Sequence, residues 1–106
     1  MPRLKRLQFL GDSLARLRDF TEEARKEAGV QLHKVQLGLE PSDWKPMTTL
    51  GAGVREIRIR EAAGAFRVLY VAQLGEEVLV LHAFQKKTQR TAKRDLDLAA
   101  SRLSRL

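Results

Sequence analysis

The sequence predicts a single α+β domain with two N-terminal helices packed on a small antiparallel sheet, and a third helix at the C-terminus. Three observations predict this class. Apolar residues recur every three or four positions before residue 40, strand-like runs fill much of residues 54–84, and an amphipathic segment follows. Because the chain has only 106 residues, 43% of them hydrophobic, residues 1–106 are predicted to form one domain around one core.

The first part of the chain is predicted to hold a weak edge strand and two helices. Apolar residues lie between charges over residues 4–10, which favours a short edge strand. From Leu14 the apolar residues follow helical spacing. Gly29 stands where a glycine commonly ends a helix, and helical spacing resumes from Val30 to Leu39. We therefore expect a hairpin of two helices that meet at Gly29.

Three strands are predicted in the second part. Val54–Arg60 alternates between apolar and polar residues, which is typical of a strand with one polar face. Phe66–Ala72 and Val78–Phe84 are almost continuously apolar, and Gln73–Glu77 joins them. They are expected to pair as antiparallel neighbours, followed by a third amphipathic helix over residues 92–106.

The two prolines in Pro41–Pro46 predict a turn between the two parts of the chain. Trp44 and Met47 are expected to fill a junction between helices and sheet. Helices on one face of the sheet would leave the other face open. The polar residues Glu56, Arg58 and Arg60 would lie on that open face, which makes it the expected site.

The amino-acid composition limits the classes of function that the protein can have. The formal charge is +7, from 20 Lys and Arg against 13 Asp and Glu, and it points to a polyanion or an acidic protein as partner. The absence of cysteine excludes a disulfide scaffold and a thiol nucleophile. Two isolated histidines argue against a metal site, and without a phosphate-binding Gly-rich loop the sequence predicts no nucleotide cofactor. No apolar run is long enough to span a membrane, and we expect a cytoplasmic protein.

The most basic segment is His82–Arg94, where five of thirteen residues are Lys or Arg. It is either a solvated connection or a surface for phosphates and unstacked RNA bases. In the second interpretation, the candidate RNA-binding residues are Arg60, His82, Phe84, Gln85, Arg90 and Lys93. His82 shares strand parity with apolar neighbours, which also suits a hydrogen-bonded core histidine.

Arg67 interrupts an apolar strand and needs acceptors if it is buried. It either pairs with Glu56 or Glu61, or points onto the open face and binds a phosphate. Glu56 and Arg58 are two residues apart on one strand face. They form either a structural ion pair or a base beside an anion-stabilising guanidinium.

Four segments together resemble the phage-derived, HigB-type branch of the RelE/ParE toxin superfamily. They are Asp43–Met47, Val54–Ile59, Gly64–Tyr70 and His82–Thr88, and the resemblance covers roughly residues 11–106. The most specific feature is the combination of H-A-F-Q-K-K-T with an upstream F-R-V-x-Y strand. The resemblance implies a fold of the microbial ribonuclease type.

The resemblance also implies the toxin of a type II toxin–antitoxin pair that cuts mRNA on the ribosome without a metal. In that chemistry the RNA 2′-hydroxyl attacks the adjacent phosphate. Arg67 matches the family's strand arginine at the scissile phosphate, Arg58 a basic residue on the preceding strand, and Lys86 or Lys87 the basic residue after the last strand. Glu56, where the best-known RelE-type toxins carry a lysine, is the candidate base, with His82 as the runner-up.

The expected partner is a cognate antitoxin with an acidic segment and a helix-turn-helix domain, and the expected substrate is mRNA on the ribosome. Two alternatives remain open. One is a gyrase-inhibiting toxin of the ParE type, and the other is a non-catalytic module that binds RNA or the ribosome.

Overall fold

The computed structural model describes residues 3–72 and 75–106, and its helices and strands form an α+β fold. Gln73 and Leu74, in the predicted connection between the last two strands, lie outside the described residues. No helix in the described part is long and apolar enough to cross a membrane. The elements are β1 (Arg6–Phe9), α1 (Ser13–Arg18), α2 (Glu22–Gln36), β2 (Trp44–Pro46), β3 (Val54–Glu61), β4 (Gly64–Val71), β5 (Glu77–Lys86) and α3 (Lys93–Ser104).

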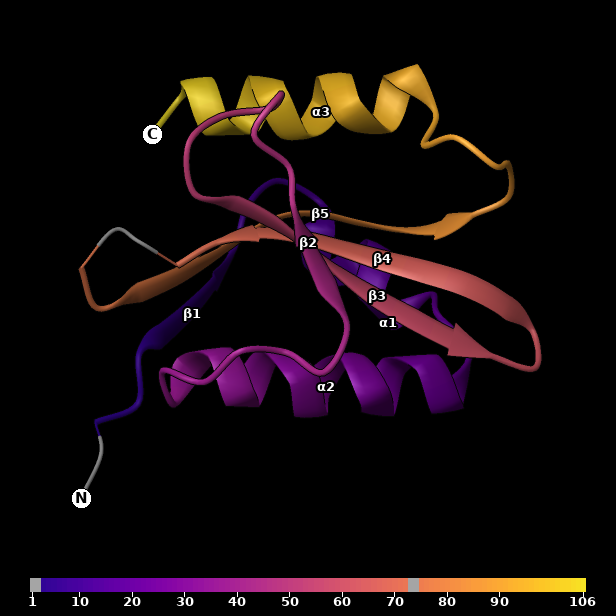
Figure 1. The fold of residues 1–106 in the computed structure, drawn as a ribbon, viewed down its shortest axis with the longest axis horizontal. Coiled ribbons are helices and arrows are strands. Elements are labelled where there is room, and N and C mark those ends of the chain that lie inside the picture. The colour runs from indigo at the N-terminus through magenta and orange to yellow at the C-terminus, as the bar shows by residue number, and fades with distance from the viewer. Residues whose placement is uncertain (1–2, 73–74) are drawn as a thin grey trace.

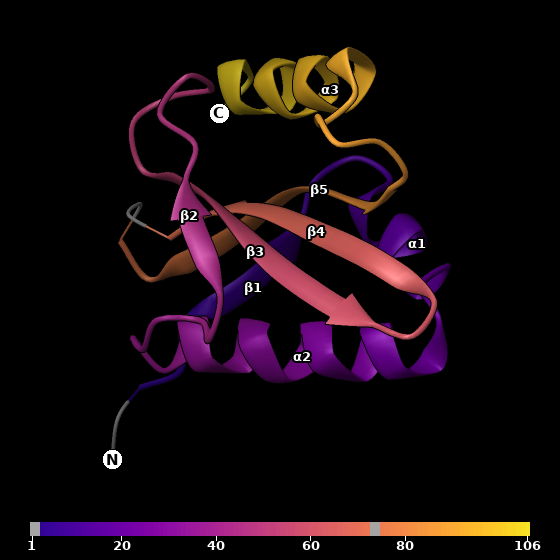
Figure 2. The same cartoon turned by 45° about the vertical axis from the view of Figure 1, so that its right-hand side comes forward.

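The strands form one sheet in the order β1-β5-β4-β3-β2. The antiparallel neighbours β3, β4 and β5 confirm the predicted meander (Figure 2). β1 pairs parallel to β5, so the sheet is mixed and the prediction of a purely antiparallel sheet is wrong. Two helices and three strands separate β1 from β5, and this long connection allows the parallel pairing. β5 continues to Lys86, which brings Gln85 and Lys86 into the sheet.

Helices cover both faces of the sheet, with α2 on one side and α3 on the other (Figure 1). The α1/α2 side holds the larger apolar cluster, which includes Ile57 and Val68. On the other side, Ala99 of α3 packs in a smaller cluster with Leu69 and Leu81. The expectation that one face would stay open is therefore wrong. The apolar stripe of α3 is buried against the face that α1 and α2 leave uncovered. Outside this apolar cluster, the same face carries polar residues of β3 and β4.

The break between the first two helices lies at Thr21, and Gly29 is inside α2. Thr21 begins α2 as its N-cap, because its hydroxyl accepts a hydrogen bond from the backbone N–H of Ala24 (3.3 Å). The glycine that follows the end of α2 is Gly38, with φ +83°. The prediction that Gly29 ends a helix was wrong, since one helical glycine costs only about 1 kcal/mol and the buried face of α2 outweighs it.

Replacing Gly29 by Ala is expected to stabilise the protein by about 0.5–1 kcal/mol. Gly29 is exposed in mid-helix, and a Cβ added there meets no atom of the described residues within 4 Å. The gain comes from the lower conformational entropy of the unfolded chain. Urea unfolding of Gly29→Ala checks the gain, and an unchanged or lower free energy of unfolding would contradict this account of α2.

The segment predicted as a turn contains the three-residue edge strand β2. β2 pairs with β3, so that Trp44 lies opposite Ile57 and Lys45 opposite Glu56. Trp44 is half-buried, and its ring lies beneath the guanidinium of Arg55, 4.1 Å from the ring centroid. The prediction that Trp44 fills a core junction between helices and sheet is therefore wrong, whereas Met47 packs against the smaller apolar cluster. Proline is tolerated here because an edge strand leaves one side without a hydrogen-bonded neighbour.

Candidate functional site

Three charged side chains of β3 and β4 meet on the face that α3 partly covers. Arg58 and Arg67 are directly opposite each other in the β3–β4 pairing, and Glu56 precedes Arg58 by two residues on the same face. Glu56 Oε1 lies 3.4 Å from Arg58 Nε and 3.4 Å from Arg67 Nε. One carboxylate therefore sits between two guanidinium groups. We call Glu56, Arg58, Arg67 and the neighbouring Lys86 the basic cluster.

The Glu56–Arg67 pair is buried, with 1% and 3% of the two residues exposed. Arg67 Nη1 donates a hydrogen bond to the carbonyl of Phe66 (3.0 Å). Among the described residues, Glu56 Oε2 and Arg67 Nε have no partner with hydrogen-bond geometry. Burial lowers the pKa of Arg67, and the charge of Glu56 opposes that effect. Such a partly satisfied ion pair is expensive in a core and is commonly found where function requires it.

The structure shows which carboxylate pairs with Arg67. Of the two predicted carboxylates, its partner is Glu56, and Glu61 instead accepts a hydrogen bond from the hydroxyl of Thr21 (2.7 Å). Arg67 also shares its face with Arg58. Of the two alternatives that the sequence left open, the structure shows the ion pair with Glu56, and phosphate binding by Arg67 stays a prediction.

Lys86 belongs to the cluster, and Lys87 does not. Lys86 is half-buried near the end of β5, whereas Lys87 is exposed beyond the strand. Burial, followed by the positive charge of Arg67, lowers the pKa of Lys86, and the charges of Arg58 and Lys45 act in the same direction. Positive charge therefore concentrates around one carboxylate, which favours binding of an anion.

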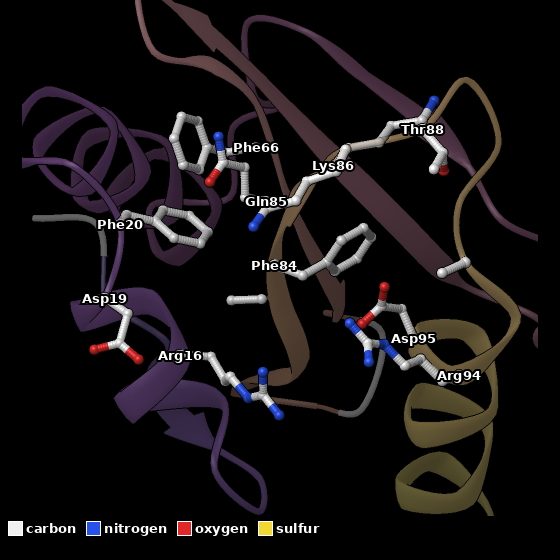
Figure 3. A pocket seen from close by; sticks show the side chains of 13 residues that line it. Arg16, Asp19, Phe20, Phe66, Phe84, Gln85, Lys86, Thr88, Arg94 and Asp95 are labelled. Atoms are coloured by element: carbon white, nitrogen blue, oxygen red, sulfur yellow. The ribbon is translucent and has the colours of Figure 1, made fainter.

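A pocket of about 350 Å³, drawn in Figure 3, is lined in part by Lys86 of the basic cluster. It runs beside the part of β5 that β1 does not pair, because the β1 register ends at Val80. Lys86 belongs both to the wall of this pocket and to the basic cluster. Aromatic rings and cations both line it, a combination that suits nucleic-acid bases and phosphates. The lining residues are Arg16, Asp19, Phe20, Phe66, Ala83, Phe84, Gln85, Lys86, Lys87, Thr88, Ala92, Arg94 and Asp95.

His82 is fully buried, so it is not accessible to RNA, although the sequence placed it among the candidate RNA-binding residues. Its Nε2 lies 2.7 Å from Asp95 Oδ1, and its ring stacks on Phe84 with centroids 5.3 Å apart. Burial lowers the pKa of His82, and Asp95 partly offsets that shift. Arg102 of α3 also donates to the carbonyl of Leu81 (2.8 Å). His82 is therefore the hydrogen-bonded core histidine, and its contact with Asp95 links α3 to the sheet.

The other candidate RNA-binding residues are dispersed. Phe84 and Gln85 line the pocket, and Gln85 also donates to the carbonyl of Ala63 (3.2 Å). Arg60 is exposed near Arg67 and helps to lower the pKa of Arg67. Arg90 and Lys93 are exposed and do not line the pocket, and Lys93 Nζ pairs with Asp97 (2.8 Å).

Sequence reasoning missed three cations of this region. Lys45 comes to the cluster through the pairing of β2 with β3, and a strand over Trp44–Pro46 would have placed it opposite Glu56. Arg94 lies within the basic segment but was not singled out. Arg16 comes from α1, and no local pattern indicates that α1 packs beside β5.

The fold and this site define a class: a small, basic α+β protein whose sheet places two arginines and a lysine around a buried carboxylate. Residues 15–104 match the model of the family described as phage derived protein Gp49-like (DUF891). The chain belongs to this Gp49-like family, a toxin-like family of toxin–antitoxin systems. No curated protein matches the sequence.

Proposed function

We propose that the protein is the toxin of a type II toxin–antitoxin pair and acts as an endoribonuclease on mRNA bound to the ribosome. The observation that carries the proposal is the Glu56 carboxylate between Arg58 and Arg67, with Lys86 nearby. Membership of the Gp49-like family supports the toxin part. The resemblance to HigB-type toxins supports the choice of mRNA as substrate.

The reaction we propose uses the RNA 2′-hydroxyl as nucleophile. Its attack on the neighbouring phosphorus displaces the 5′-oxygen of the next nucleotide, so a base, a stabiliser of the phosphorane oxygens and an acid are needed. In this proposal Arg58 and Arg67 hold those oxygens. Guanidinium groups suit this task because their planar donors match phosphate oxygens in pairs.

The burial of Glu56 suggests a role for it beyond that of a base. With only 1% of its surface exposed and Oε1 facing two guanidinium groups, it orients Arg58 and Arg67 before the substrate arrives. Preorganised charge stabilises a transition state without further rearrangement. Substrate phosphate then shares the guanidinium groups with Glu56. In the proposed step the 2′-hydroxyl must reach the buried Oε2 of Glu56, which has no hydrogen-bond partner among the described residues, to pass its proton to it.

Lys86 is the proposed acid for the leaving oxygen. A lowered pKa makes the ammonium group a stronger proton donor, and its neighbours are the two arginines proposed to hold the phosphate. Lys86 also lines the aromatic pocket. We propose that a nucleotide flanking the cut lies in this pocket against Phe84.

The expected pH dependence follows from that role. Because Lys86 must be protonated to donate, cleavage should slow as the pH rises through its pKa, which lies below the ordinary lysine value of 10.5. Lys86→Arg should cleave more slowly and lose this alkaline fall, because arginine stays protonated. Lys87→Arg is the matched control and should keep it. Single-turnover rates against pH check this, and an unchanged profile in Lys86→Arg would exclude Lys86 as the acid.

The proposed partner is an antitoxin that covers this basic surface with an acidic segment. A net charge of +7 gives such a segment electrostatic attraction and a high association rate. The predicted helix-turn-helix domain of the antitoxin remains an expectation from the resemblance.

Brief expression followed by primer extension tests the function, with translation active or blocked. Cuts within coding frames that require translation would support the proposal. Growth arrest without any cut would contradict it, and a gyrase supercoiling assay would then separate the ParE-type alternative from a module that only binds RNA or the ribosome.

A further inference from the structure

A second pocket, of about 240 Å³, lies beside the C-terminal end of α2, on the face of the sheet opposite the basic cluster. Arg55 and Glu56 are adjacent in β3, and alternation along a strand points them to opposite faces. The pocket is therefore separate from the basic cluster. Its lining includes Lys5, Arg55 and Tyr70, and we call it the Tyr70 pocket.

The hydroxyl of Tyr70 is the unusual feature. Tyr70 is 1% exposed, and its hydroxyl has no partner with full hydrogen-bond geometry among the described residues. Burial raises the pKa of Tyr70, and the nearby Arg55 guanidinium, as a hydrogen-bond donor, opposes that rise. A buried hydroxyl without a partner carries a substantial free-energy cost. Arg55 lies directly opposite Tyr70 in the β3–β4 pairing, and Lys5 lines the same pocket. Both are pure donors, so neither can accept the proton of the phenol.

The two cations are held in place before any ligand arrives. Arg55 rests on the ring of Trp44, 4.1 Å from its centroid. The main chain of Lys5 exchanges two hydrogen bonds with Gln36, both of 2.9 Å. Lys5 Nζ donates to the carbonyl of Ala72 at 3.3 Å, a long contact that leaves other donor positions on the ammonium group.

Glu40 is the carboxylate that lines the pocket, and it holds Arg55 only loosely. Its Oε1 is 4.0 Å from Arg55 Nη1, and its side chain is 67% exposed. An ion pair of this kind contributes little free energy. An incoming anion can therefore displace Glu40 at small cost.

We propose that the Tyr70 pocket binds a phosphate group, held by the Arg55 guanidinium, the Lys5 ammonium and a hydrogen bond donated by the Tyr70 hydroxyl. Phosphate oxygens accept from all three groups, and only an acceptor satisfies the O–H proton of the buried phenol. Guanidinium can bind two phosphate oxygens at once. The inference is independent of the nuclease proposal, because it shares no residue with the basic cluster.

The chain contains its own reporter, since Trp44 is its only tryptophan and contacts Arg55. Trp44 fluorescence is followed while sodium phosphate replaces sodium chloride at constant ionic strength. Equilibrium dialysis with radiolabelled phosphate gives a second readout that does not depend on Trp44. Wild type should bind saturably by both, and Tyr70→Phe should bind about tenfold more weakly while keeping the buried ring.

Two further variants separate binding from folding. Lys5→Gln should also weaken binding, and it removes no buried group because Lys5 is only half-buried. Arg25→Gln, on an exposed position of α2, should bind as wild type does. A linear response like that to chloride, a Tyr70→Phe affinity equal to wild type, or equal saturation by sodium acetate would overturn the assignment to phosphate.

A 2′-O-methyl oligonucleotide without terminal phosphates identifies the source of the group. If it displaces labelled phosphate from wild type and binds Tyr70→Phe more weakly, the ligand is a phosphodiester of a nucleic-acid backbone. If it leaves the phosphate bound, the site takes free phosphate or a phosphate monoester.

Discussion

Arg67→Gln is expected to lower the rate of mRNA cleavage on the ribosome by about 10²–10³-fold, the usual loss when one donor to a transition-state oxyanion is removed. The variant removes the positive charge beside Glu56 while keeping a polar, though shorter, side chain. Arg67→Lys should restore only part of the rate, because an ammonium group cannot donate two parallel hydrogen bonds. Single-turnover cleavage of ribosome-bound mRNA measures both.

Control experiments distinguish a lower cleavage rate caused by the missing guanidinium from one caused by unfolding. Arg25→Gln removes one arginine from an exposed position of α2 and should cleave as wild type does. Circular dichroism and thermal unfolding must show that Arg67→Gln is folded under the assay conditions. Wild-type cleavage by folded Arg67→Gln would remove Arg67 from the mechanism.

Glu56→Ala is expected to destabilise the protein by about 3–5 kcal/mol, because it leaves the buried Arg67 without its carboxylate. The cost is that of an uncompensated buried charge. Urea unfolding monitored by circular dichroism measures the free energy of unfolding.

The double variant Glu56→Leu with Arg67→Met tests the cause of that loss. Replacing both members of a buried ion pair by apolar residues is often neutral or stabilising, so the double variant should recover most of the lost stability. It should still fail to cleave mRNA. If Glu56→Ala is as stable as wild type, the buried charge of Arg67 does not need the Glu56 carboxylate, which would contradict the expected cost.

The part of the fold that could be predicted from sequence is the part with strong local signals. Apolar runs bounded by turn residues identified β4 and most of β5. Alternation within β3 placed Glu56 and Arg58 on one face, and the structure adds Arg67 directly opposite Arg58. Strand parity therefore predicted that Glu56 and Arg58 share a face, and the register that brings Arg67 to them came from the structure.

The rest depends on contacts distant in sequence. Amphipathic spacing showed that α3 buries one side but not which face of the sheet it covers, so the open face was overestimated. Gly29 and Gly38 both have the residue type that ends helices, and only Gly38 stands where α2 ends. β2 has three residues, too few to show alternation, so Lys45 could not be placed beside Glu56.

Glu56, Arg58, Arg67 and Lys86 are proposed to promote attack of the RNA 2′-hydroxyl on the adjacent phosphate. The most direct measurement is the chemistry of the cut ends after purified protein acts on a defined mRNA in purified ribosome complexes. We expect a 2′,3′-cyclic phosphate, or the 3′-phosphate from its opening, on the upstream fragment and a 5′-hydroxyl on the downstream fragment. No cut is expected where a 2′-deoxynucleotide replaces the nucleotide whose 2′-hydroxyl attacks. A 5′-phosphate, or cleavage after that deoxynucleotide, would contradict this mechanism.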